Sequence, residues 1–290
     1  MHSLSTAPSV ATYLFLALGI LSLWLTPNPR VWLSLGALAI AFGIASGRVL
    51  ALGVCAAVLL CLACFLYFRR RLRPGAKIAV GFVILLVSLL LGTHTLPGFK
   101  NWLILSGISL SPDAIPMNLY LNFDKALVGL FLIGWGYKPI QTLKEWRAML
   151  AKTAPILLMT VAVLLGLCLG SGYVKVDFKW VEFSGLWLIV NLIFACVAEE
   201  ALFRGFLQER LSAVLKPWKN GSILALLLTS ILFGLAHFKG GTTLIVFATL
   251  AGIFYGLAYL RTKRLEASIL THFAVNAIHF LAFTYPALRR

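Results

Sequence analysis

Long apolar runs recur along this chain, and they restrict its fold more than any other feature of the sequence. A run of about 18 or more apolar residues is long enough to cross ~30 Å of hydrocarbon as an α-helix. Apolar residues make up 61% of the chain and charged residues 12%, compared with roughly 25% charged residues in soluble domains. The sequence therefore predicts an all-α polytopic membrane protein with about ten transmembrane helices.

The expected spans are separated by short segments in which proline, glycine and basic residues gather. We place the spans at residues 10–25, 31–46, 49–68, 78–96, 119–137, 153–169, 184–211, 222–238, 242–260 and 267–286. The span at 119–137 is interrupted early by Asn122 and Asp124, so we expect it to be short or tilted.

Three segments between the spans have patterns of their own. Residues 97–124 contain Pro112 and Pro116 and are expected to form an outside loop with interfacial pieces. Residues 138–152 intersperse apolar and charged side chains, which favours an amphipathic helix on the inner surface. Residues 173–183 alternate apolar and charged side chains, which is typical of a strand-like outside loop.

The basic residues set the expected orientation in the membrane. Residues 69–77 read RRRLRPGAK, and five positive charges in so short a loop place it in the cytoplasm. The net charge of +16 lies mainly in such short segments, so anionic lipid headgroups, and not nucleic acid, are the expected counter-charge. We expect a multi-pass protein of a bacterial inner (plasma) membrane.

One stretch, residues 191–210, carries charged side chains on an otherwise apolar helical pattern. Glu199 and Glu200 are adjacent there, and a charge near hydrocarbon costs roughly 2.5–3.5 kcal/mol on insertion scales. Arg204 follows Glu200 by four residues and shares its helix face, whereas Glu199 is rotated by about 100°. We therefore expect Glu200 and Arg204 to form a structural pair and Glu199 to be left without a charged partner.

Further polar side chains fall within the last three spans. His237 ends one helix, while His272 and Asn276 lie four residues apart on the last one and so share a face. On the expected topology Glu199, His272 and Asn276 fall toward the cytoplasmic third, and His237 nearer the outside. Each residue alone is as well explained by structure, but their concentration in about eighty apolar residues favours a functional site.

The chemistry of these side chains is that of peptide-bond hydrolysis. A carboxylate in an apolar pocket is a general base near neutral pH, and a histidine can hold the water that it activates. A second histidine and an asparagine amide can donate hydrogen bonds to the oxyanion. Since no serine or cysteine lies beside a base in these motifs, a covalent nucleophile is not favoured.

The motifs E-E-x-x-x-R, F-x-x-x-H and H-x-x-x-N, in this order on successive helices, resemble those of the CAAX protease and bacteriocin-processing family of intramembrane endopeptidases. Here they read EEALFR from Glu199, FGLAH from Phe233 and HFAVN from His272. The resemblance covers the chain from about residue 153. It implies N-terminal transmembrane helices without a recognised motif at 1–152 and a C-terminal catalytic helix bundle at 153–286.

The resemblance also implies roles for these residues. Glu199 would activate water with the help of His237, and His272 with Asn276 would form the oxyanion hole. Glu200 and Arg204 would be the structural pair. The implied activity is that of a glutamic-type intramembrane endopeptidase without a cofactor, acting on a membrane-associated peptide or protein in the lipid bilayer.

Three alternatives remain open from the sequence. The family has also been classed as metalloendopeptidases, and zinc bound by Glu199, His237 and His272 is possible in principle, although no H-E-x-x-H helix pairing is present. A non-catalytic immunity or scaffold relative is a second alternative, which the intact motifs disfavour. A proton-relaying transporter is a third, which the lack of a repeated motif in the first half disfavours. The oligomeric state is not indicated.

Overall fold

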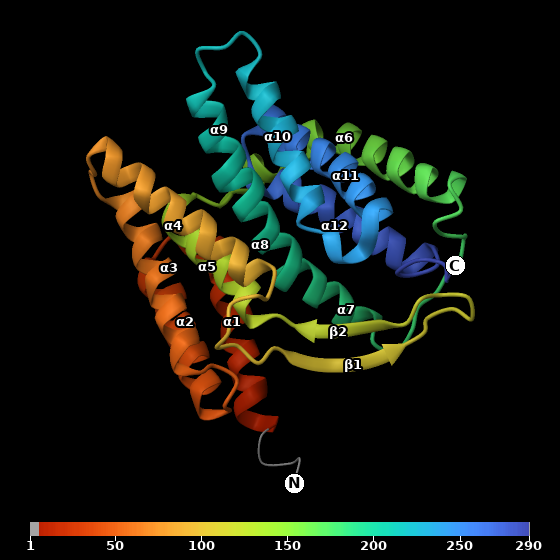
Figure 1. Cartoon of the computed structure of the whole chain (residues 1–290), viewed down its shortest axis with the longest axis horizontal. Coiled ribbons are helices and arrows are strands. Elements are labelled where there is room, and N and C mark those ends of the chain that lie inside the picture. The colour runs from red at the N-terminus through yellow and green to blue at the C-terminus, as the bar shows by residue number, and fades with distance from the viewer. Residues whose placement is uncertain (1–5, 290) are drawn as a thin grey trace. The chain divides into compact units, whose positions relative to one another are not determined.

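The structure of this protein, a computed structural model, describes residues 6–289 and is built almost entirely of helices (Figure 1). These residues divide into two compact units that do not follow the order of the sequence. The first unit contains the described residues up to Trp102, together with Leu121–Gln141 and Ile193–Gly205. The second contains Leu103–Tyr120, Thr142–Leu192 and the chain from Phe206 onward, so the long helical segment Ser184–Val214 supplies residues to both units.

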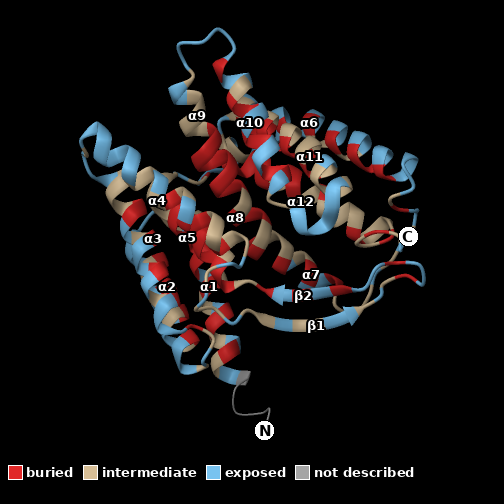
Figure 2. Cartoon of the chain, in the orientation of Figure 1, coloured by how far each residue is buried: buried red, intermediate tan, exposed pale blue. Residues whose placement is uncertain are grey.

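The first unit is organised around one buried helix. Its helices are α1 (Thr6–Leu25), α2 (Pro29–Ala45), α3 (Ala51–Arg69), α4 (Pro74–Gly92), α5 (Phe123–Gly136) and the short α8 (Val197–Glu200). Helix α5 contacts all five of the others. Nearly every residue of α5 from Phe123 to Ile133 is buried (Figure 2), which makes it the core of this unit.

The second unit is a helix bundle with a two-stranded sheet. Its elements are β1 (Trp102–Ile108), β2 (Met117–Leu121), α6 (Leu143–Gly170), α7 (Ser184–Val190), α9 (Glu209–Val214), α10 (Gly221–Leu235), α11 (Gly241–Thr262) and α12 (Leu265–Ala282). Helix α11 packs against α6, α10 and α12. Its small residues Ala248, Ala251, Gly252 and Gly256 are buried, which allows the close helix contacts expected of a membrane bundle.

The prediction of an all-α polytopic membrane protein is confirmed. Seven helical segments of the described residues are long and apolar enough to cross a membrane, and α2 and α10 are shorter apolar helices. Every predicted span overlaps a helix. Large apolar side chains such as Leu62 on α3, Phe82 on α4 and Leu158 on α6 are exposed, as expected for faces that contact lipid (Figure 2).

The separation of residues 138–152 from the span that follows is wrong, because both lie on the single 28-residue helix α6. Thr142 caps this helix by accepting a hydrogen bond from the Glu145 amide, so the helix starts at Leu143. Pro155 lies inside α6 without ending it. Proline is tolerated within membrane helices because neighbouring groups satisfy the freed backbone positions.

The two predicted outside loops also differ from expectation. Residues 97–124 include the strands β1 and β2, which Figure 1 shows running in opposite directions, and the residues of β2 alternate between buried and exposed. Residues 173–183 form no strand in the described chain and only one bridge, from Val176 to Phe283. Alternation of polarity therefore identified the wrong segment as strand-like.

Candidate active site

Glu199 and Glu200 lie on the four-residue helix α8, which has a π-helical segment on either side. These segments are Asn191–Cys196 and Ala201–Gln208. π-helical turns are rare and occur frequently at functional sites. The apolar periodicity of the sequence predicted a regular helix here. The sequence did not indicate the irregular backbone around the glutamates.

The ion pair expected from the four-residue spacing is present. Arg204 Nη1 lies 3.1 Å from Glu200 Oε1, and both side chains have 0% of their surface exposed. Removing two charges from water is favourable only when they are close and hydrogen-bonded to each other or to their neighbours. The pair therefore accounts for a fully buried carboxylate in this helix.

Glu199 differs from the expectation that it has no charged partner. Lys125 Nζ, on α5, lies 2.9 Å from Glu199 Oε1 and donates a hydrogen bond to it. The two side chains keep 17% and 15% of their surface exposed, respectively. Each of the adjacent glutamates thus has a cation of its own, and only Glu199 is reachable from outside the packed interior. We call Lys125, Glu199, Glu200 and Arg204 the glutamate cluster.

His237 follows α10 and is oriented by the backbone of that helix. Its Nδ1 lies 2.8 Å from the carbonyl oxygen of Phe233. A carbonyl oxygen only accepts hydrogen bonds, so Nδ1 carries the hydrogen and Nε2 of the neutral ring has the lone pair. His237 therefore presents a proton acceptor at Nε2.

His272, on α12, is held between aromatic rings of the second unit. Tyr255 of α11 stacks on it, with ring centroids 4.6 Å apart and an interplanar angle of 15°. The ring of Phe233 meets His272 edge-on at 5.8 Å and lies 4.8 Å from the ring of His237. Both histidines therefore contact one phenylalanine ring, although the expected topology placed His237 nearer the outside than His272.

Two features of α10 bear on this contact. The helix has 15 residues, which corresponds to ~22 Å and is too short to cross the hydrocarbon. Gly234, within the FGLAH motif, lets α10 approach α11 closely, because a Cβ there would collide with Thr249 Oγ1. The end of α10, which His237 follows, therefore packs closely against α11.

Asn276 is oriented by a second asparagine. Its Nδ2 donates a hydrogen bond of 3.2 Å to Oδ1 of Asn191, which lies in the first π-helical segment. An amide NH₂ has two hydrogens, so this bond fixes the orientation of the group that carries the other. We call Asn191, Phe233, His237, Tyr255, His272 and Asn276 the histidine cluster.

Comparison with known proteins bears on both clusters. Residues 180–278 match the family model described as type II CAAX prenyl endopeptidase Rce1-like. This match, over about a third of the chain, supports a CAAX protease family assignment for that segment. The match contains the EEALFR, FGLAH and HFAVN motifs in full. No curated protein and no solved structure matches the chain.

The match supports CAAX-type peptidase activity in general for this segment. The long apolar helices make the chain an integral, multi-pass membrane protein. The matched residues begin at 180, so α1 to α6 and both strands precede them.

The structure adds three residues that the motifs of this CAAX protease do not include. Lys125 precedes the matched segment, whereas Asn191 and Tyr255 fall within it but outside the motifs. A signal was available for two of them, because Lys125 and Asn191 are polar residues inside apolar runs, which is the pattern that marks functional positions in membrane helices. Tyr255 had no such signal, since an aromatic residue on a membrane helix is ordinary.

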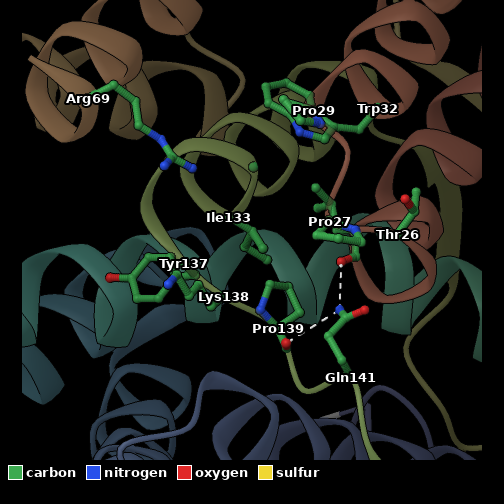
Figure 3. Close-up of a pocket in the computed structure, with 12 residues that line it drawn as sticks. Thr26, Pro27, Pro29, Trp32, Arg69, Ile133, Tyr137, Lys138, Pro139 and Gln141 are labelled. Atoms are coloured by element: carbon green, nitrogen blue, oxygen red, sulfur yellow. Dashed lines mark hydrogen bonds between the residues drawn. The ribbon is translucent and has the colours of Figure 1, made fainter.

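The first unit also has a pocket of about 380 Å³ that contains none of the predicted site residues (Figure 3). It is lined at the ends of α1, α3 and α5 and the start of α2 by residues that include Trp32, Arg69, Tyr137 and Lys138. Gln141 donates hydrogen bonds to the carbonyl oxygens of Leu23 and Pro139 there. These helix ends all fall on the cytoplasmic side of the predicted topology, well along α5 from Lys125.

Proposed function

We propose that this protein hydrolyses a peptide bond in a membrane-associated peptide or protein by means of a water molecule activated by Glu199. The observation that carries the assignment is the unequal exposure of the two glutamates. Glu200 is fully buried against Arg204, whereas Glu199 keeps 15% of its side chain exposed. A general base has to reach the water that it deprotonates, so Glu199 is the one suited to the role.

In this mechanism the water oxygen attacks the scissile carbonyl carbon while its proton passes to the Glu199 carboxylate. The carbonyl oxygen becomes an oxyanion, to which His272 and Asn276 donate N–H hydrogen bonds. As the carbon–nitrogen bond breaks, the proton passes on to the leaving nitrogen, which gives a carboxylate and an amine. Glu199 is then ionised again and ready for the next turnover.

The other residues of the histidine cluster have supporting roles in the proposal. His237 accepts a hydrogen bond from the water at Nε2, because its Nδ1 hydrogen is donated to the Phe233 carbonyl. Asn191 holds the Asn276 amide in one orientation, and we assign an N–H of this amide to the oxyanion.

A glutamate mechanism is favoured over the zinc alternative by the position of Lys125. Its ammonium group lies 2.9 Å from Glu199 Oε1, where it occupies an oxygen that a metal ligand would need and repels a divalent cation. Dialysis against a strong chelator is therefore expected to leave activity intact. Loss of activity on chelation, with recovery on adding zinc, would instead make Glu199, His237 and His272 metal ligands.

The experiment that tests the proposal compares Glu199→Gln with Glu200→Gln in liposomes. The name of the matched family makes a quenched peptide with a farnesylated cysteine near its carboxyl terminus the first substrate to try, beside an unprenylated peptide of the same sequence. Glu199→Gln should lower turnover by about 10²–10⁴-fold in protein that still folds, with a moderate drop in melting temperature because Lys125 loses its ion-pair partner. Retention of activity within a few-fold of the parent would end the assignment of Glu199 as the base.

A further inference from the structure

Lys125 is the residue of the glutamate cluster that the family match leaves out. It is the third residue of α5, 55 positions before the matched segment begins at residue 180. Its ammonium group forms an ion pair with Glu199, at 2.9 Å. Since a lysine inside the apolar core of a membrane protein is costly, its presence calls for a specific use.

The packing of α5 against α8 brings the lysine to the glutamate. Gly129 lies four residues after Lys125 and on the same face of α5. A Cβ at Gly129 would lie 3.1 Å from the Cα of Ala198, the residue before Glu199, so only a glycine lets the two helices come this close without a shift. The backbone contact therefore sets the distance that the lysine side chain spans.

The first turn of α5 is held in place by further hydrogen bonds. The Lys125 amide donates a bond of 2.8 Å to Asp124 Oδ1. Asp124 in turn accepts bonds from Asn101 at 2.9 Å and lies 2.8 Å from His94 Nδ1. The lysine therefore projects from a fixed backbone toward Glu199. The other titratable groups near it are Asp124 and Cys196.

The chemistry of a base in an apolar site explains why such a cation is useful. A carboxylic acid in apolar surroundings prefers its neutral form, and the neutral form cannot take a proton from water. An ammonium group within 4 Å favours the ionised form. It also holds Oε1 in one position, which directs the proton transfer to Oε2.

We propose that Lys125 is a positioning residue of the active site, which fixes the Glu199 carboxylate and keeps it ionised at the pH at which it acts as the base. The inference rests on the proposed role of Glu199. Lys125 keeps its own proton throughout the reaction and touches neither the substrate nor the attacked carbonyl. The active site of this protein then includes a residue from the chain that precedes the family match.

The first test is the pH dependence of kcat/KM on the farnesylated quenched peptide. Lys125→Met should move the acid limb of the profile to higher pH by about 1–3 units, because an opposite charge at this distance has an effect of that size. Activity at pH 7 should fall by about 10–10³-fold and recover as the pH rises, with KM nearly unchanged. Lys125→Arg should restore the parent profile, and Lys138→Met, at an exposed lysine just beyond the same helix, should not alter it.

The second test does not depend on catalysis. Infrared spectra of the folded protein at neutral pH should contain a new carboxylic acid band in Lys125→Met, which is absent from Lys125→Met with Glu199→Gln. An unshifted acid limb together with no new band would reduce Lys125 to a structural residue and overturn the inference. If Glu199→Gln stays active, the proposed function fails, and the infrared band still reports whether Lys125 controls the ionisation of Glu199.

Discussion

The glutamate cluster and the histidine cluster solve the problem of holding polar groups in a membrane protein in different ways. The glutamate cluster consists of four ionised side chains in two ion pairs, of which one is fully buried. The histidine cluster contains no carboxylate, lysine or arginine and relies on ring stacking and on hydrogen bonds to a backbone carbonyl and an amide. Charge is thus balanced by charge in one region, and neutral groups are held by ordinary packing in the other.

The difference teaches where each cluster obtains its support. His237 is held by Phe233 of its own motif, four residues away. Glu199, by contrast, is paired with a lysine 74 positions earlier in the chain. A neutral ring can be oriented by a nearby carbonyl, but a carboxylate needs a full opposite charge to offset its desolvation. The motifs therefore contain the residue that orients His237 but not the cation that pairs with Glu199.

The largest expected effect is on stability, from the buried ion pair. Arg204→Met leaves Glu200 without its ion-pair partner in the interior, which commonly costs about 3–5 kcal/mol. The melting temperature in detergent and the yield of folded protein should both drop sharply. Adding Glu200→Gln to Arg204→Met should recover part of the lost stability, because the double variant has the same net charge in this interior as the parent.

The control for this prediction is Arg261→Met, at an exposed arginine near the end of α11. It should leave the melting temperature nearly unchanged. If Arg204→Met also costs less than about 1 kcal/mol, the size expected of a surface pair, then the contrast between a charge-balanced and a neutral cluster has no energetic basis.

The next effect is on activity, from the histidine cluster. His272→Phe keeps an aromatic ring against Tyr255 but removes the N–H donors. Removing one oxyanion donor typically lowers kcat by about 10²–10³-fold, while the retained ring should preserve the melting temperature. His279→Phe, the same substitution farther along α12, should leave turnover unchanged. A large loss of stability with proportionate loss of activity would make His272 a packing residue.

A smaller effect is expected from Asn191, which orients Asn276 without contacting the substrate in the proposed mechanism. Asn191→Ala removes the acceptor of one hydrogen bond, and a neutral bond contributes about 0.5–1.5 kcal/mol. We expect kcat to fall by about 2- to 10-fold with KM unchanged, measured on the same quenched peptide. Asn191→Asp retains an acceptor oxygen and should be closer to the parent. An unchanged kcat in Asn191→Ala would remove Asn191 from the site.

Most of the fold could be predicted because hydrocarbon imposes a simple rule on the sequence. A span needs an apolar run of fixed length, and each predicted span overlaps a helix. The errors occur where that rule does not apply. The charged residues among 138–152 suggested a separate surface helix in what is one helix with the span that follows, and the β1–β2 pairing depends on contacts between strands that periodicity in a short segment does not define.

For the site, the sequence predicted contacts between near neighbours and missed those between distant ones. The Glu200–Arg204 pair follows from the helix repeat, and the shared face of His272 and Asn276 does as well. The Lys125–Glu199 and Asn191–Asn276 contacts join different helices. A helical pattern gives the direction of a side chain around its own axis, but it does not specify which helix lies opposite.

The smallest effect is expected at a partly exposed ion pair outside the membrane spans, which serves to calibrate the two buried clusters. Asp177 accepts hydrogen bonds from Ser111 Oγ and from Lys179 Nζ, the latter at 2.9 Å. The Ser111 bond, followed by the Lys179 bond and charge, lowers the pKa of the Asp177 carboxyl below its usual value. A third of the Asp177 side chain is exposed. Solvent screening should therefore keep the contribution of this ion pair to the free energy of unfolding within about 0.2–1 kcal/mol.

Because the folded-state pKa of Asp177 is depressed, its contribution is present above the unfolded value of about 3.9 and is lost as the pH falls through the folded value. Asp177→Asn should therefore lower the melting temperature by at most about 2–4 °C at neutral pH, and the difference from the parent should vanish in strong acid. Scanning calorimetry in detergent, from neutral pH to strong acid, measures the melting temperatures of the parent and of Asp177→Asn and their difference. A loss as large as that of Arg204→Met would mean that burial does not determine the strength of the ion pairs in this protein, and the contrast between the clusters would then need a different explanation.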